Sequence, residues 1–254
     1  MTADLVAVWF GALDGTTWFE QDADVPLYAA SLVKVPIATA AAGLDWSEPI
    51  ALHADFASQA GGRYELDRDD DQDDVTWDAL AGRAATATLG ELVHRSITVS
   101  SNVAANLVLE RVGVPAVQAV LREAGVSDRT TFGRGIGDAA AREAGPDNRV
   151  TARDLGRVLA RTPERVVEVM RAQTYRDGIP AGLAGLAPGA DVANKTGWVD
   201  GLTHDMALVR ADGPDAEPCA LVVLTRTGLD HEHAEALVAR TAAQAWAHRP
   251  VAAR

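Results

Sequence analysis

Hydrophobic positions at both ends of the chain follow the patterns expected of β-strands. The first segment, LVAVWFGAL, is followed by the turn signal Asp14-Gly15 and then by WFEQ, which predicts a β-hairpin. Near the other end, DVANKTG, HDMALVRA and CALVVLTR alternate or run apolar as strands do. A last helix is predicted from Glu232 to about Ala247, with Asp230 as its N-cap.

The middle of the chain has helical periodicity instead. A helix rich in Ala and Val is predicted from Ser31 to about Ala42, and Pro36 lies early enough in it to be tolerated. Gly113 and Gly125 are expected to end two of the later helices. The later helical segments are TLGELVHRSI after the cap Thr88, NVAANLVLERVG, VPAVQAVLREAG, TARDLGRVLA and ERVVEVMRAQ. Strands at both ends with helices between them predict one sheet built from both termini and a helical insertion.

Three segments lack clear periodicity. Residues 55–75, which end in DRDDDQDD, are predicted to form a solvated acidic loop, because the glycine and terminal glutamate of an EF-hand are missing. RGIGDAAAREAGPDNRV is predicted to be a structural loop. The segment HEHAE, with His231 and His233, is not a His-Glu-x-x-His motif, and we expect the first turn of a helix there rather than a metal site.

Composition narrows the possible partners. Of 254 residues, 48% are apolar and 23% charged, as in ordinary globular proteins, and the net charge of −13 argues against a nucleic-acid partner. The one cysteine, Cys219, lies in an apolar run and is predicted to be a buried, inert thiol. We see neither a signal peptide nor an apolar stretch of about 18–20 residues, and therefore expect a monomeric cytoplasmic protein without a membrane partner.

Three short motifs carry candidate chemistry. Ser31 and Lys34, three apart on a predicted helix, share one face, and a desolvated lysine can activate a serine. SSN, residues 100–102, precedes another helix, and KTG, residues 195–197, lies on a predicted strand. In this order SLVK, SSN and KTG resemble the signature motifs of the class A serine β-lactamases and penicillin-binding proteins, and the resemblance covers nearly the whole chain.

The resemblance implies a fold and a chemistry. The fold is an α/β + α unit spanning residues 1–254, with an antiparallel sheet flanked by helices and an all-helical lobe. Residues 1–37 and 172–254 would form the α/β lobe, and residues 38–171 the helical lobe. The implied function is that of a serine hydrolase that works through an acyl-enzyme, without metal or other cofactor. Its substrate would be a small acyl compound, namely a β-lactam, a peptide or an ester.

Each motif residue takes a role from the resemblance. Ser31 would be the nucleophile and Lys34 its activating base, while Ser100 would pass a proton to the leaving nitrogen beside Lys195. The implied substrate-binding residues are Asn102, Thr196, Gly197, Trp198 and His204. Among them, Asn102 would bind the substrate's side-chain amide and Thr196 its carboxylate. The backbone N–H groups of Ser31 and Trp198 would form the oxyanion hole.

The chain departs from the class A pattern in two places that affect catalysis. Ile136 occupies the position of the glutamate that directs the hydrolytic water, if Arg134 is the loop arginine, and Ala140 occupies the position of an asparagine. Asp138 would replace that glutamate, or Asp138 and Glu143 would simply face solvent or cap the loop. His204 lies where many class A enzymes have an arginine, and it is expected either to contact a ligand or to pair with Asp205.

A third departure is Ser101, which stands where class A enzymes usually have a structural aspartate. Two other functions stay open beside the β-lactamase-like hydrolase. One is a peptidase, esterase or transacylase with slow β-lactam deacylation. The other is a penicillin-binding protein that is acylated once without turnover.

Overall fold

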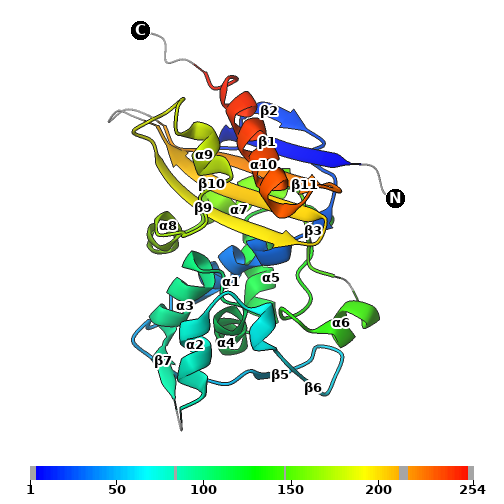
Figure 1. Cartoon of the computed structure of the whole chain (residues 1–254), viewed down its shortest axis with the longest axis vertical. Coiled ribbons are helices and arrows are strands. Elements are labelled where there is room, and N and C mark those ends of the chain that lie inside the picture. The colour runs from blue at the N-terminus through cyan, green and yellow to red at the C-terminus, as the bar shows by residue number, and fades with distance from the viewer. Residues whose placement is uncertain (1–3, 83–84, 146, 212–216, 251–254) are drawn as a thin grey trace.

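The computed structural model describes residues 4–82, 85–145, 147–211 and 217–250. Its main sheet has five antiparallel strands in the order β2-β1-β11-β10-β9 (Figure 1). The strands are β1 (Leu5–Ala12), β2 (Thr17–Gln21), β9 (Asp191–Val199), β10 (Leu202–Arg210) and β11 (Cys219–Arg226). Because β1 pairs with β11, the two ends of the chain meet in the middle of the sheet, which confirms the predicted architecture.

Helices cover both faces of this sheet (Figure 1). On one face lie α9 (Ile179–Leu183) and α10 (His231–Trp246), and Phe10 of β1 packs against Trp246 with 5.5 Å between ring centroids. The other face is covered by α7 (Ala152–Arg161), which contacts β1 and β11. Successive side chains of a strand point to opposite faces, so Trp9 lies on the α7 side while Phe10 lies on the α10 side.

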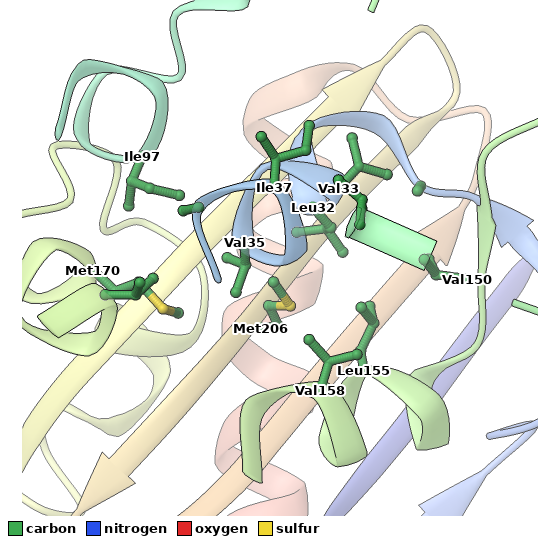
Figure 2. Packing of buried hydrophobic residues seen from close by; sticks show 14 of the residues in the cluster. Leu32, Val33, Val35, Ile37, Ile97, Val150, Leu155, Val158, Met170 and Met206 are labelled. Atoms are coloured by element: carbon green, nitrogen blue, oxygen red, sulfur yellow. The ribbon is translucent and has the colours of Figure 1, made fainter. Parts of the chain in front are cut away.

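The lobe below the sheet in Figure 1 is mainly helical. At its centre lies α1 (Lys34–Ala41), preceded by the 3₁₀ turn η1 (Ala30–Val33). Figure 2 shows the buried side chains around α1, which include Met206 of β10 and Met170 of α8 (Glu164–Arg171). This apolar cluster joins the helical lobe to the sheet, so the two form one continuous core.

Shorter elements complete the lobe. Thr88 is the N-cap of α3 (Leu89–Thr98), as predicted, and it forms a capping box with Glu91. Gly113, with φ of 81°, separates α4 from α5 as expected of a glycine stop. The remaining helices are α2 (Asp74–Leu80), α3 (Leu89–Thr98), α4 (Asn102–Val112), α5 (Val114–Glu123) and α6 (Ala139–Ala144), with the 3₁₀ turn η2 (Arg68–Asp70). Short strand pairs are β3 (Leu27–Tyr28) with β8 (Arg149–Val150), β4 (Pro49–Ala51) with β7 (Thr86–Thr88), and β5 (Asp55–Ala57) with β6 (Arg63–Glu65).

The structure corrects three expectations. Residues 55–75 are not a single loop, because β5 and β6 form a short hairpin there and η2 follows. The segment after Arg134 contains α6, which Asp138 caps. The predicted boundary places residues 152–161 in the helical lobe. In the structure these residues form α7, which packs against the sheet and covers Trp9.

In the part of the chain that the structure describes, no single helix has the length and apolarity needed to cross a membrane. The helices α4 and α5 would meet that test only together, across a bend of 87°.

The packing of α7 on the sheet gives a test of the fold. A Cβ on Gly156 would lie 2.3 Å from the Trp9 ring, so Gly156→Ala forces the helix and the indole apart. We expect the free energy of unfolding to fall by about 1–3 kcal/mol, the usual effect of overpacking a core. Urea denaturation measures this change. Gly43→Ala is the matched control, because a Cβ there meets nothing within 4 Å. Equal stability of the two variants would contradict this account of how α7 is seated.

Candidate active site

Ser31 lies in η1, immediately before the helix that carries Lys34. Lys34 Nζ is 3.0 Å from Ser31 Oγ, and the Lys34 side chain has no solvent exposure. The predicted pairing of these two residues is therefore present, although the first turn is 3₁₀ rather than α. In a 3₁₀ turn, residues three apart are eclipsed, which brings the hydroxyl directly over the amine.

Ser100 lies between two lysines from distant parts of the chain. Its hydroxyl oxygen is 3.1 Å from Lys34 Nζ and 3.0 Å from Lys195 Nζ. Lys34 also donates to the backbone oxygen of Ser100, and Lys195 donates to the backbone oxygen of Thr196 at 2.8 Å. The four predicted catalytic residues, Ser31, Lys34, Ser100 and Lys195, thus form one connected hydrogen-bonded chain.

Burial weakens the basicity of both lysines. Removing the ammonium from water lowers the pKa of Lys34 to about 7, and the negative charge of Asp71 partly opposes that shift. The pKa of Lys195 is also lowered well below its ordinary value, first by burial and then by the charge of Lys34. Near neutral pH a large fraction of Lys34 is therefore an uncharged amine, which has the free electron pair that a base requires.

The hydrogen-bond geometry around Lys34 agrees with an uncharged amine. Four oxygens surround Nζ: Ser31 Oγ, Ser100 Oγ, the Ser100 carbonyl and, at 2.7 Å, Asn102 Oδ1. The carbonyl and amide oxygens can only accept, and they use the two hydrogens of a neutral amine. The electron pair is then left to accept a hydrogen from one of the two serine hydroxyls.

Strained backbone marks the same place. Among the described residues, the non-glycine residues with positive φ are Asp22, Ala30 and Ser100. Ala30 directly precedes the predicted nucleophile, with φ of 45°, and Ser100 has φ of 61°. Such conformations cost about 1–3 kcal/mol each and persist only where surrounding contacts enforce them. Here the contacts with the buried lysine hold Ser100 in place.

Gly197 lets the edge strand β9 approach Ser31 closely. A Cβ at this position would lie 2.9 Å from the Ser31 backbone nitrogen and 3.2 Å from that of Leu32. No side chain fits there without moving η1. The close approach of β9 to η1 therefore requires glycine at position 197.

The remaining predicted binding residues differ in their freedom to bind. The Thr196 hydroxyl is buried and has no hydrogen-bond partner within the described chain, so it is available to a ligand. Asn102 is already engaged, because Nδ2 donates to the Asp70 carbonyl at 2.7 Å and would have to exchange that bond for a substrate. The Trp198 ring packs edge-on against Tyr175, 4.9 Å between centroids, and lies 5.1 Å from His231. Tyr175 was not predicted from the sequence.

The prediction that His204 contacts a ligand is wrong. Its ring is buried, Nδ1 accepts a hydrogen bond from the Thr225 N–H at 3.1 Å, and Nε2 lies 3.0 Å from the Tyr28 carbonyl oxygen. Both ring nitrogens are therefore used by backbone groups, which fixes a neutral imidazole with its hydrogen on Nε2. Burial lowers the pKa of His204 to about 4.

The alternative pairing of His204 with Asp205 is also wrong, since neighbours on a strand point to opposite faces. Asp205 accepts hydrogen bonds from the Ile179 N–H at 2.8 Å and from Asn194 Nδ2 at 3.1 Å. Burial raises the pKa of Asp205 to about 7, while these hydrogen bonds and Lys195 act in the opposite direction. Asp205 and Asn194 thus brace β9 beside Lys195, a pairing that no sequence motif indicated.

The loop after Arg134 is held by three contacts. Arg134 pairs with Asp147 at 2.6 Å, which closes the loop at its base. Asn106 binds both backbone groups of Ile136, accepting from its N–H at 2.9 Å and donating to its carbonyl at 2.8 Å. Asp138 is buried and caps α6 through the Ala141 N–H.

Of the two roles proposed for Asp138, the structure supports capping. Its carboxylate also accepts from Ser58 Oγ at 2.8 Å and from the Gln59 N–H at 2.9 Å. Asp138 is buried, and its three hydrogen bonds with Ser58, Gln59 and Ala141 all hold the chain in place. Ile136 itself carries no group that accepts a proton.

An aspartate that the sequence did not single out reaches the site from the acidic run. Asp71 accepts hydrogen bonds from the backbone N–H groups of Asn102 and Val103, at 3.0 and 2.9 Å. The only signal in the sequence was the run DRDDDQDD itself, and nothing in its spacing distinguishes Asp71 from its neighbours.

Within the described residues, no group of three or more His, Cys, Asp or Glu side chains could hold a metal ion. His231 and His233 lie in the first turn of α10, where Asp230 caps the helix through the His233 N–H at 3.0 Å. The predicted helix start is therefore correct. Cys219 is buried in β11, as expected.

The chain is similar to known serine enzymes over nearly its whole length. Residues 2–249 match the sequence model of a family described as the beta-lactamase enzyme family. No curated protein sequence matches the chain.

Solved structures of similar fold include a beta-lactamase from Sphaerobacter thermophilus DSM 20745, 24% identical, with a TM-score of 0.73 over 98% of this chain and 94% of that one. A beta-lactamase from Xanthomonas campestris pv. campestris str. ATCC 33913 is 20% identical, with a TM-score of 0.76 over 96% and 91%. PBP-A is 19% identical, with a TM-score of 0.72 over 97% and 91%. At these identities the similarity establishes the fold.

The burial of His204 predicts how the stability of the protein depends on pH. Its ordinary pKa is 6.5 and its pKa in the folded protein is about 4. Between these values the unfolded chain binds a proton that the folded chain excludes. Stability therefore falls as the pH is lowered through this range, by up to about 1.4 kcal/mol per pH unit from this group.

The measurement is urea denaturation at pH 7, 6, 5 and 4.5 for the wild type and for His204→Gln, which lacks the titrating ring. We expect the wild type to lose more stability on acidification than the variant. Parallel pH curves would contradict a buried, neutral His204.

Proposed function

The chain belongs to the beta-lactamase enzyme family, and on that premise we propose that this β-lactamase-like serine hydrolase forms its acyl-enzyme on Ser31. The observation that carries the proposal is the contact of the buried Lys34 amine with both Ser31 Oγ and Ser100 Oγ. Lys34 is thus able to take a proton from one hydroxyl and to return a proton through the other.

Acylation begins with proton transfer from Ser31 to Lys34. Uncharged Lys34 accepts the hydroxyl proton while Oγ attacks the substrate's carbonyl carbon, and the bond from carbon to nitrogen then breaks. The departing nitrogen takes a proton from Ser100 Oγ. Ser100 regains one from Lys34 Nζ at 3.1 Å, so the proton taken from the nucleophile ends on the leaving group.

Lys195 has an electrostatic role in this scheme. Its buried Nζ lies 3.0 Å from Ser100 Oγ and donates a hydrogen bond that stabilises this oxygen as the proton leaves. The developing oxyanion on the substrate is assigned to the backbone N–H groups of Ser31 and Trp198. The close approach of β9 to η1 at Gly197 supports this assignment, because it brings the backbone of β9 next to the backbone nitrogen of Ser31.

The substrate that suits this site is a small acyl compound with a carboxylate, such as a β-lactam. The unpartnered Thr196 hydroxyl is the group available for that carboxylate. Asn102 is the amide group available for the acyl side chain, once it gives up the Asp70 carbonyl.

Acylation should be confined to Ser31. We expect a fluorescent penicillin to label the wild type with one adduct per chain and to leave Ser31→Ala unlabelled. The variant should keep its stability to within about 1 kcal/mol, as small changes at a cleft serine usually do. Ser47→Ala, at an exposed position outside the site, is the control and should label normally. Peptide mapping that located the adduct on Ser100 or Ser101 would overturn the proposed nucleophile.

Deacylation should be the slow step. Ile136 cannot activate water, Asp138 is fully engaged in structural hydrogen bonds, and a positioned general base usually contributes about 10²–10⁴-fold. We therefore expect nitrocefin hydrolysis to show a burst of about one equivalent of enzyme, followed by a steady phase slower by roughly that factor.

Two variants at one position test the cause. Ile136→Glu places a carboxylate on a backbone that Asn106 already fixes, and should accelerate the steady phase. Ile136→Gln has nearly the same shape without a base and should not. Rapid turnover of the wild type without a burst would show that another group activates the water.

A further inference from the structure

Asp71 makes an unusual set of contacts at the first turn of α4. Its two carboxylate oxygens accept from the Asn102 N–H, both at 3.0 Å, and one of them also accepts from the Val103 N–H at 2.9 Å. These N–H groups have no partner within the helix, and a negative charge is favourable there. Asp71 comes from the segment before α2, about 30 residues earlier in the sequence.

The N-cap residue of α4 does not bind the N–H groups of Asn102 and Val103. Ser101 is the N-cap of α4, and its short side chain accepts from the Ala104 N–H at 3.2 Å. A serine carries no charge, so the motif SSN by itself brings no carboxylate to the turn. Asp71 supplies the missing charge from outside the motif.

The same helix turn connects Asp71 to the catalytic lysine. Asn102 donates its backbone N–H to Asp71 and accepts from Lys34 Nζ at 2.7 Å through Oδ1. One residue therefore separates the carboxylate from the amine. Asp71 raises the pKa of Lys34 against the effect of burial. The pKa of the Tyr175 phenol is raised first by burial and then by the charge of Asp71.

Few charges act on Lys34 from the elements around it. The charge of Lys34 lowers the pKa of the buried Lys195, which shares the Ser100 hydroxyl with it, and Asp205 acts on Lys195 in the opposite direction. Asp71 is the carboxylate whose negative charge raises the pKa of Lys34. Two buried lysines would repel each other if both were charged.

We propose that Asp71 is a positioning residue of the active site, whose carboxylate fixes the first turn of α4 and serves as the counter-charge of Lys34 across Asn102. It does not touch the reacting atoms. It sets the orientation of Asn102 and Ser100, and it sets the pH at which Lys34 becomes available as a base. This inference rests on the proposed role of Lys34 in acylating Ser31.

The test is the pH dependence of the acylation rate, followed with a fluorescent penicillin under single-turnover conditions. In the wild type the rate should rise with pH through a midpoint near 7, as Lys34 loses its proton. In Asp71→Asn the loss of the negative charge makes the ammonium less stable, so the midpoint should move to lower pH. We expect a shift of about one pH unit, the low end of the effect of a nearby opposite charge.

Asp69→Asn is the matched control. It removes the same charge from the same acidic run, and its exposed side chain makes no hydrogen bond or ion pair within the described residues. Its midpoint should coincide with that of the wild type. If the midpoint of Asp71→Asn also coincides with that of the wild type, Asp71 is not the counter-charge of Lys34 and the inference is overturned.

A double variant separates charge from folding. Asp71→Asn combined with Ser101→Asp returns a carboxylate to the N-cap of α4, where aspartate caps well. If Asp71→Asn alone does not fold, a folded double variant with a midpoint near that of the wild type supports the inference. A folded double variant whose midpoint stays low contradicts it.

The same data distinguish failure of the inference from failure of the proposed function. A wild type whose acylation rate has no rise near pH 7 contradicts Lys34 as the base, whatever Asp71 does. A normal wild-type profile that Asp71→Asn leaves unchanged contradicts only the role of Asp71.

Discussion

The burial of two lysines against one serine hydroxyl is the constraint on which the rest of this structure depends. Lys34 and Lys195 are both excluded from water, and both lie within 3.1 Å of Ser100 Oγ. Two ammonium groups cannot be kept together in such a place without a large energetic cost. Burial lowers the pKa of both lysines, and the nearby carboxylates Asp71 and Asp205 partly oppose this shift. A lysine with a lowered pKa can act as a base near neutral pH.

The carboxylates that stabilise the lysines are kept one residue away from them. Asp71 acts through Asn102, and Asp205 is joined to Asn194, the residue before Lys195. A direct ion pair would hold the amine protonated and remove its electron pair from use. An intervening amide transmits part of the electrostatic effect while leaving the amine free to exchange protons with the serines. The strained conformation of Ser100 belongs to the same arrangement, since its hydroxyl and carbonyl both face Lys34.

The acylation half and the deacylation half of the site are built differently. On the first side, hydrogen bonds connect Ser31, Lys34, Ser100 and Lys195 in one chain. On the second side the loop is well ordered by Arg134, Asn106 and Asp138, yet the side chain that it presents is Ile136. The proposed slow deacylation follows from this difference, because Ile136 has no group that accepts a proton. Family membership alone would not reveal this, because fold and chemistry are separable.

The sequence by itself determined the sheet built from both termini, the helices between its strands and the three motifs, because local periodicity, caps and turn signals are written in neighbouring residues. It also singled out Ser31, Lys34, Ser100 and Lys195, which the structure joins by hydrogen bonds. Only the tertiary structure decided the functions of His204, Asp138 and Asp71. His204 is engaged by backbone groups of Tyr28 and Thr225, Asp138 by residues 58 and 59, and Asp71 by the first turn of α4. These partners lie about 20 to 180 residues away in the chain, and a polar side chain takes its role from the partners that folding brings within hydrogen-bond distance.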